Sequence, residues 1–278
     1  MSASTRHPQE PPDPELVCFY VNETLCAVDV ARVLTIDAYK GGLCAVPGSR
    51  PGLLGLAADH RGNRPVPVYD LAVLLGVESG QDSRRTLIET LTAREKDHVD
   101  WLDALEASVR DGVPFTRATD PHACAFGQWY DRFRTRDEVL GTLLEKFDEP
   151  HRRIHALGAR LLGLRDAGRV DEALAALEEE RTTTLQLLRR LFTRAREQLR
   201  AAMRPVTLYL DDGDGAASLG LVLDEIHSVE RVPATGVRAA GDIGIGSGAD
   251  VLHDVARAGD RDILWLDVDH LTGCEAAV

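Results

Sequence analysis

Long apolar runs are absent from this sequence of 278 residues, in which 18 apolar residues never follow one another. A membrane-spanning helix needs roughly 20 predominantly apolar residues, so we expect no membrane insertion. The first residues, MSASTRHPQEPPDPE, also lack the apolar core of a secretory signal peptide. We therefore expect a cytoplasmic protein, in which residues 1–14 form a disordered tail.

Cysteine, aromatic residues and positive charge are all in short supply. The five cysteines are scattered, which argues against a disulfide framework and suits a reducing compartment. Aromatic residues make up only 5% of the chain. The 32 Lys and Arg residues face 45 Asp and Glu residues, giving a net charge of −13. This charge argues against nucleic acid and anionic lipid as partners.

The charge is distributed unevenly along the chain. Residues 1–80 carry 6 basic and 9 acidic residues, and residues 205–278 carry 4 and 14. Residues 81–204 carry 22 of each sign, so this middle block is neutral. Interspersed charges of both signs are typical of long amphipathic helices. The chain therefore divides into three blocks.

The two outer blocks have the pattern of β-structure. Their short runs of β-branched and aromatic residues are separated by Gly, Pro and Asn. The strands that we expect are Leu16–Val21, Thr24–Val30, Gly52–Ala58, Arg64–Asp70, Val206–Asp211, Ala217–Asp224, Ser228–Val232 and Asp262–Leu271. Asp70 should cap a short helix that ends at Gly76. The acidic run Asp211–Gly215 lacks the spacing of an EF-hand, so it predicts a hairpin turn rather than a calcium site.

The middle block has apolar residues at helical spacing instead. Asp120 and Pro121 supply a cap and a first helical residue for a second helix, and Gly112 and Gly168 supply helix ends. The four helices expected are 87–111, 120–133, 148–167 and 170–199. Their short connections predict an antiparallel four-helix bundle.

One histidine or cysteine on such a helix would be read as a core residue, but this bundle carries four together. His151 and His155 lie four positions apart and so point the same way. With His98 and Cys124 they make a set of three imidazoles and one thiolate, which suits tetrahedral zinc. His122 faces elsewhere on its helix, so it is a candidate for supporting the ligands from outside.

The surroundings of Cys124 are unusual for this chain. Gly127 removes a side chain where a neighbouring helix should come close, and Phe126, Trp129 and Phe133 should form the core around the site. The run HACAFGQWY (His122–Tyr130), together with DHVDW around His98 and PHRRIH ending at His155, resembles the chemoreceptor zinc-binding domain (CZB) family over residues 84–203. The resemblance implies that His98, Cys124, His151 and His155 are zinc ligands. Members of this family lie in cytoplasmic regions of bacterial signalling proteins and sense zinc, or oxidants through the cysteine.

The outer blocks resemble a second family, the CheW chemotaxis adaptors. The matching segments are AVDVARV (Ala27–Val33), Pro47-Gly48, LLGLA (Leu53–Ala57), Arg61-Gly62, PVPVYDLAVLLG (Pro65–Gly76), LGLVLDEIHSVERVP (Leu219–Pro233) and ILWLDVDHL (Ile263–Leu271). His60 and the glycine-rich Gly241–Gly248 depart from the family pattern.

The two resemblances imply an α+β multidomain fold. A discontinuous CheW-like domain, a double five-stranded β-barrel at residues 15–80 and 205–273, is interrupted by an inserted CZB four-helix bundle at residues 81–204. Partners implied by the CheW resemblance are chemoreceptor cytoplasmic tips and the regulatory domain of a CheA-type histidine kinase. Arg61 and Gly62 are the expected partner-binding residues. The bundle should be entered through a flexible linker, VESGQDS, and left at Arg204-Pro205.

Three function classes follow. The first is a signalling adaptor whose insert senses zinc or oxidant. In the second the zinc is purely structural and the bundle forms a homodimer. The third, a zinc hydrolase, is disfavoured because Arg152 stands where the HExxH pattern has its general base. Four protein ligands also leave no coordination position for water, so we expect no enzyme activity.

Overall fold

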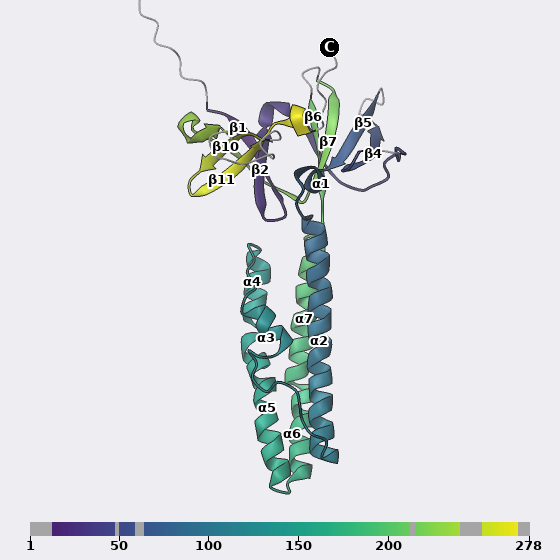
Figure 1. Cartoon of the computed structure of the whole chain (residues 1–278), viewed down its shortest axis with the longest axis vertical. Helices are drawn as coiled ribbons and strands as arrows, with labels where there is room; N and C mark the ends of the chain where they lie inside the picture. Colours follow the sequence, from purple (N-terminus) through teal and green to yellow (C-terminus); the bar gives the residue numbers. More distant parts are fainter. Residues whose placement is uncertain (1–12, 48–49, 59–63, 212–214, 240–251, 272–278) are drawn as a thin grey trace, which may run out of the picture. The chain divides into compact units, whose positions relative to one another are not determined.

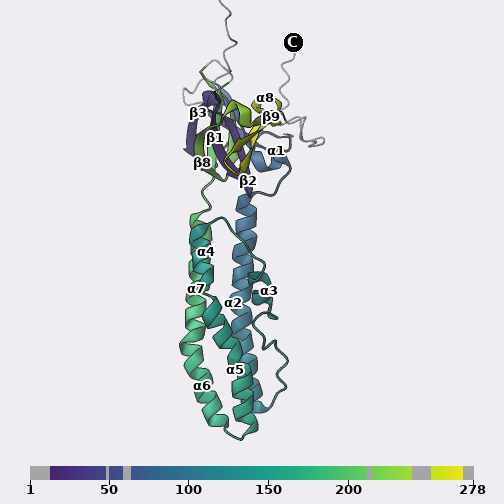
Figure 2. The same ribbon diagram turned by 90° about the vertical axis from the view of Figure 1, so that its left-hand side faces the viewer.

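The computed structural model describes residues 13–47, 50–58, 64–211, 215–239 and 252–271. Contacts divide the chain into two compact units (Figure 1; Figure 2). The first unit joins residues 1–83 to 204–278 and contains the strands, and the second, residues 84–203, is helical. The predicted α+β architecture, in which a helical insert interrupts a β-unit, is confirmed.

Six strands of the described residues form one sheet, in the order β8-β1-β2-β11-β10-β9. They are β1 (Glu15–Val21), β2 (Thr24–Asp29), β8 (Glu225–Arg231), β9 (Val237–Ala239), β10 (Leu252–Ala258) and β11 (Arg261–Leu266). Strand β1 pairs antiparallel with both β2 and β8, and β2 pairs parallel with β11. This sheet therefore needs chain from both sides of the insert.

The second sheet has five strands, in the order β3-β6-β7-β5-β4. They are β3 (Val33–Ala38), β4 (Leu53–Ala58), β5 (Pro65–Asp70), β6 (Val206–Asp211) and β7 (Ala217–Leu223). Strand β6 pairs antiparallel with β3, and β7 pairs parallel with β5. The two halves of the β-unit are thus intertwined in both sheets.

Strand β1 shows why the first unit can hold two apolar clusters. Successive side chains of a strand point to opposite faces. Val17 and Phe19 accordingly join the cluster shared with β6 and β7, whereas Leu16 and Cys18 join a second cluster with Ala256 of β10. A strand buried on both faces has a continuous apolar sequence rather than an alternating one.

Short helices and turns complete the first unit. Helix α1 (Leu71–Leu75) begins at Asp70, whose carboxylate accepts hydrogen bonds from the backbone N–H groups of Ala72 and Val73, and it ends at Gly76 as predicted. The 3-10 turns are Val30–Arg32 and Ala234–Gly236, and α8 spans Val268–Leu271. Strands β6 and β7 form an antiparallel hairpin, and the Asp211 carboxylate accepts a hydrogen bond from Gly215 N. The predicted hairpin pairing of these two strands is confirmed, whereas residues 212–214 of the acidic run lie outside the described residues.

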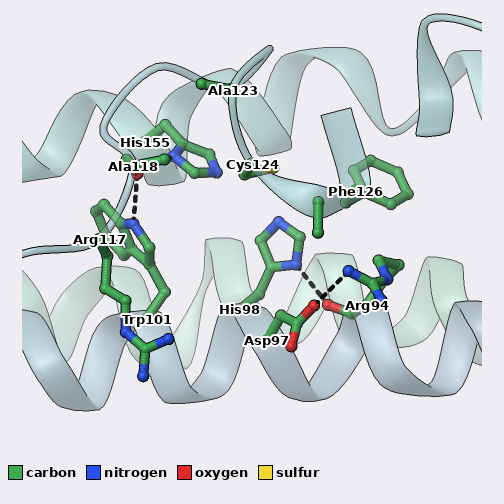
Figure 3. A pocket seen from close by; sticks show the side chains of 11 residues that line it. Arg94, Asp97, His98, Trp101, Arg117, Ala118, Ala123, Cys124, Phe126 and His155 are labelled. Carbon is green, nitrogen blue, oxygen red and sulfur yellow. Dashed lines mark hydrogen bonds and ion pairs between the residues drawn. The ribbon is translucent and has the colours of Figure 1, made fainter. Parts of the chain in front are cut away.

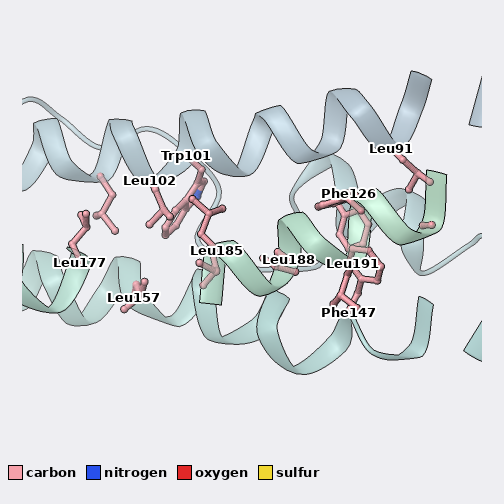
Figure 4. Close-up of a cluster of buried hydrophobic side chains, with 14 of the residues drawn as sticks. Leu91, Trp101, Leu102, Phe126, Phe147, Leu157, Leu177, Leu185, Leu188 and Leu191 are labelled. Carbon is pink, nitrogen blue, oxygen red and sulfur yellow. The ribbon is translucent and has the colours of Figure 1, made fainter. Parts of the chain in front are cut away.

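The helical unit is built from six helices in the described part of the chain. They are α2 (Gly80–Asp111), which begins in the first unit, and α3 (Ala125–Tyr130), α4 (Glu138–Glu145), α5 (Asp148–Asp166), α6 (Val170–Thr182) and α7 (Thr184–Ala201). Figure 4 shows leucines of α2, α5, α6 and α7 meeting in one core, among them Leu102, Leu157, Leu177 and Leu188.

Three details of the β-unit differ from the sequence-based expectation. One sheet has six described strands rather than five, because the three residues of β9 add to the edge of β10. Strands β3 and β10 were not predicted either. Most of β3 is exposed, and only Val255 and Ala256 of β10 are buried, so neither strand carries a clear apolar pattern. The strand expected at Asp262–Leu271 ends at Leu266, before α8.

Two helix predictions were also wrong. Pro121 does not begin a helix; α3 begins at Ala125, with Cys124 at its N-cap. The last helix divides at Thr183 into α6 and α7. The hydroxyls of Thr182 and Thr183 both donate to the Glu179 carbonyl, a side-chain bond that competes with helical geometry and bends helices.

Candidate metal centre

Three helical elements bring the four candidate ligands together. His98 lies on α2, Cys124 caps α3, and His151 and His155 lie on α5. One donor atom from each of the four lies within 4.8 Å of the other three. The three histidines are buried, and Cys124 is partly buried.

The position of Cys124 depends on the loop before α3. Its Sγ accepts a hydrogen bond from Gly127 N at 3.2 Å, and its thiol lies 3.2 Å from the Pro121 carbonyl. A Cβ at position 127 would lie 1.8 Å from that same carbonyl oxygen, so only glycine fits. The close neighbour of Gly127 is therefore its own entry loop rather than another helix.

Two backbone carbonyls orient the imidazoles. His98 Nδ1 donates to the Arg94 carbonyl at 2.7 Å, and His155 Nδ1 donates to the Ala118 carbonyl at 3.2 Å. A carbonyl can only accept, so in both rings Nδ1 carries the proton and Nε2 has its lone pair free. Both Nε2 atoms are buried and without a hydrogen-bond partner among the described residues.

The donor set fits zinc. His151 Nε2 lies 3.2 Å from Cys124 Sγ. A tetrahedral zinc ion with Zn–N of about 2.0–2.1 Å and Zn–S of about 2.3 Å separates its ligands by roughly 3.3–3.7 Å. The two orphaned Nε2 atoms, the neighbouring thiol and the third imidazole supply the four donors, which lie within 4.8 Å of one another and would draw closer around a bound ion. A thiolate with three imidazoles also excludes magnesium and calcium, which prefer oxygen.

Burial sets the protonation of the ligands. It lowers the pKa of His98, and with repulsion from the other histidines it lowers the pKa of His151 to about 3. Burial and the neighbouring His98 lower the pKa of His155 to about 4. The imidazoles are therefore neutral at neutral pH, the form that binds metal. Burial raises the pKa of the Cys124 thiol, so a bound cation is needed to favour its thiolate.

Aromatic rings enclose the centre, as predicted. Phe126 is buried and meets the His151 ring edge-on at 4.9 Å between centroids. Trp129 and Phe133 are partly buried against the same core. Trp101 was expected only as an apolar helix residue, yet its ring lies 5.1 Å from His155 and its Nε1 donates to the Ala118 carbonyl. Trp101 thus holds the loop that orients His155.

The other predicted site residues lie away from this cluster or outside the described residues. The His122 side chain is 64% exposed, and its Nδ1 lies 3.0 Å from Asp131 Oδ2. Arg61 and Gly62, and also His60 and Gly241–Gly248, lie outside the described residues. Ala118 could not be recognised from residue types, because its role depends on its backbone carbonyl.

Comparisons with known proteins agree with this site. Residues 98–162 match the family model of the chemoreceptor zinc-binding domain, a stretch that contains all four candidate ligands. The insert is thus a zinc-binding helical domain. A comparison with curated proteins gives no match. None of the helices in the described ranges is long and apolar enough to cross a membrane.

Among solved structures, the scaffolding protein TtCheW from Thermoanaerobacter tengcongensis is similar. The alignment covers 93% of this chain and 92% of that chain, with 10% sequence identity and a TM-score of 0.43.

Proposed function

We propose that this chain is a cytoplasmic, non-enzymatic signalling adaptor with a zinc-dependent sensory insert. The observation that carries the proposal is the His₃Cys cluster, in a stretch that matches a chemoreceptor zinc-binding domain and interrupts a single β-unit. The β-unit acts as the adaptor, and the helical unit reports on zinc or on oxidation of Cys124.

The adaptor assignment is supported by the sequence motifs and by the intertwined sheets. Segments that resemble CheW occur before and after the insert, and strands from both sides pair in each sheet. By this resemblance the β-unit binds the regulatory domain of a CheA-type histidine kinase and the cytoplasmic tips of chemoreceptors. Arg61 and Gly62 contribute to one of these contacts, because the arginine guanidinium offers several hydrogen-bond donors.

The chemistry of the metal centre supports a role other than hydrolysis. Four protein donors converge on one point, which fills a tetrahedral shell. Arg152, which stands in the general-base position, instead pairs with Asp148 at 2.5 Å on the exposed side of α5. Neither an open coordination position nor a base is provided.

A purely structural zinc, with the bundle serving as a homodimerisation module, is the alternative. Against it stands the apolar core of the helical unit. Leu102, Leu105, Leu157, Leu161 and Leu177 are buried and belong to one apolar cluster. Such a core should keep the helices folded without zinc. Zinc loss then changes the conformation of a folded domain, as a sensor requires.

The test is binding to purified fragments of a CheA-type kinase regulatory domain and of a chemoreceptor tip. We expect saturable binding of the zinc-loaded chain to both, and at least a fivefold loss of affinity for one of them in Arg61→Ala. Arg190→Ala, at an exposed site on α7, is the matched control. Absence of binding to either fragment would reject the adaptor role. Circular dichroism of the zinc-free chain separates the alternative, since a structural zinc predicts loss of helix.

A further inference from the structure

A cavity of about 390 Å³ lies beside the metal centre, on the helical unit. Its wall includes Cys124, His98 and Trp101, and also the charged residues Arg94, Asp97 and Arg117. Figure 3 shows Arg94 and Arg117 on opposite sides of His98. The volume falls within the range of about 300–1,000 Å³ that is usual for small-molecule pockets. We propose that this cavity binds a small organic carboxylate, held by Arg117 against an apolar wall.

The charges of the wall favour an anion. Arg94 Nη1 pairs with Asp97 Oδ2 at 2.8 Å, so these two charges offset each other. Arg117 is exposed and forms no ion pair within the ranges that the structure describes. The net formal charge of the wall is therefore positive. Arg94 Nε is a second feature that favours an anion, because this donor is buried and lacks an acceptor among the described residues. Such a donor is costly unless a ligand or water accepts from it.

The uncharged part of the cavity wall favours an anion that carries an apolar organic group. The Trp101 and Phe126 rings and several alanines, including Ala123 and Ala125, line the cavity. Both rings are almost fully buried, so the wall offers apolar contact rather than hydrogen-bond donors. Inorganic phosphate would leave this surface unused. A carboxylate with a short alkyl chain uses both parts of the wall.

Zinc should strengthen carboxylate binding. A zinc ion with one thiolate and three neutral imidazoles carries a net positive charge, and Cys124 and His98 line the cavity. A unit positive charge beside a bound anion, in a site that is partly open to water, raises the affinity for that anion by about threefold to tenfold. Carboxylate binding would thus be a second signal, besides zinc, to which the helical unit responds. This inference depends on the metal centre but not on the adaptor role of the β-unit.

The experiment is calorimetric titration of the full chain with three probes: butyrate, inorganic phosphate and butylamine. The chain is loaded with one equivalent of zinc and freed of excess metal, and a metal-free sample is titrated in parallel. We expect saturable binding of butyrate, weaker binding of phosphate and none of butylamine. Zinc-loaded protein should bind butyrate about threefold to tenfold more tightly than metal-free protein.

Arg117→Gln should weaken butyrate binding at least fivefold, because it removes a charge-assisted contact. Arg190→Gln removes the same charge from an exposed position on α7 outside the cavity and should bind as the parent does. Zinc content is measured in both variants, to show that the centre is intact. Absence of saturable butyrate binding, tighter binding of phosphate, or equal losses in the two variants would each overturn the proposal.

Discussion

The Cys124 sulfur atom has two roles in the structure. It caps α3 through Gly127 N, and it lies beside His151 Nε2 in the donor cluster. Cys124→Ala and His155→Ala each remove one of four donors. Changes to groups that only support a ligand already cost about 10–100-fold in metal affinity, so we expect at least a hundredfold loss of zinc affinity in both variants.

The measurement is the zinc-to-protein ratio after dialysis against a competing chelator. His122→Ala is the matched control, because its exposed ring pairs with Asp131 and should leave zinc binding intact. Stoichiometric zinc in both Cys124→Ala and His155→Ala would reject the ligand assignment. Zinc loss in His122→Ala as well would extend the centre beyond four residues.

For single residues, the sequence indicates which side chains form the site better than it indicates how those side chains are oriented. The four donors are recognisable because thiolate and imidazole at helical spacings have few other uses together. The bond from His98 to the Arg94 carbonyl follows from helical spacing, whereas the bond from His155 to Ala118 joins segments far apart in the sequence. The reason for a glycine at position 127 was likewise not apparent from the sequence, because the atom that leaves no room for a Cβ is the Pro121 carbonyl oxygen.

Among the helices, Glu180 on α6 is a buried carboxylate that links three elements. It accepts hydrogen bonds from Arg153 on α5 at 2.7–3.0 Å and from the Thr184 hydroxyl at the start of α7. Burial alone would raise the pKa of Glu180, but the bonds from Arg153 and Thr184 lower it below its usual value. Glu180 therefore stabilises the fold above its unfolded-state pKa of about 4.3.

This contribution should be lost as pH falls through the lowered pKa of Glu180. We expect Glu180→Gln to reduce the free energy of unfolding by about 1–2 kcal/mol at pH 7. Below about pH 4 the difference from the parent should shrink. Urea unfolding of metal-free protein at several pH values checks this, with the exposed Glu179→Gln as control. A difference that does not change with pH would contradict the role of the charge.

The start of α2 depends on a carboxylate from the second half of the chain. Asp224 is buried, and it accepts hydrogen bonds from Gly80 N at 3.1 Å and from Asn22 N at 2.7 Å. A Cβ at position 80 would lie 2.3 Å from Asp224 Oδ2. We expect Asp224→Ala and Gly80→Ala each to cost about 1–2 kcal/mol, by losing this cap or by displacing it.

Denaturant unfolding of the single and double variants measures this coupling. The double variant should cost little more than Asp224→Ala alone, because the clash disappears with the carboxylate. Glu89→Ala, at an exposed position on the same helix, should change stability by less than about 0.5 kcal/mol. Fully additive losses would argue that Gly80 and Asp224 act independently.

Helices and strands were predictable where burial leaves a clear apolar pattern in the sequence. One buried face gives α2 and α5 their helical periodicity, and burial on both faces gives β1 its continuous apolar run. The division at Thr183 was not predicted, although residues 178–184 contain no apolar residue, because it involves hydrogen bonds from the Thr182 and Thr183 hydroxyls to the Glu179 carbonyl. The entry to α2 was expected to be a flexible linker, yet it is helical from Gly80, because Asp224 supplies the cap.

For the molecule as a whole, both connections to the insert start from hydrogen bonds inside the β-unit. The entry is held by Asp224 at Gly80 N, and α2 then continues without interruption to His98. At the exit, α7 ends at Ala201, and the Pro205 carbonyl accepts a hydrogen bond from Tyr39 N before β6 begins. Pro205 cannot extend the helix. A rearrangement around His98 therefore acts on the same helix whose start Asp224 caps.

On the proposed function, we expect zinc state to change the affinity of the chain for a fragment of a CheA-type kinase regulatory domain. Loss of zinc, or oxidation of Cys124 to a sulfenic acid, removes one interaction shared by α2, α3 and α5. Coupling between two sites is typically about 1–3 kcal/mol, or roughly 5–150-fold in affinity. Calorimetry with zinc-loaded, metal-free and mildly oxidised protein measures this factor.

Because such coupling is reciprocal, the kinase fragment should change zinc affinity by the same factor. His122→Ala should respond as the parent does, and Cys124→Ala should match the metal-free state in every condition. Equal affinities in all states would mean that the insert does not signal through this adaptor.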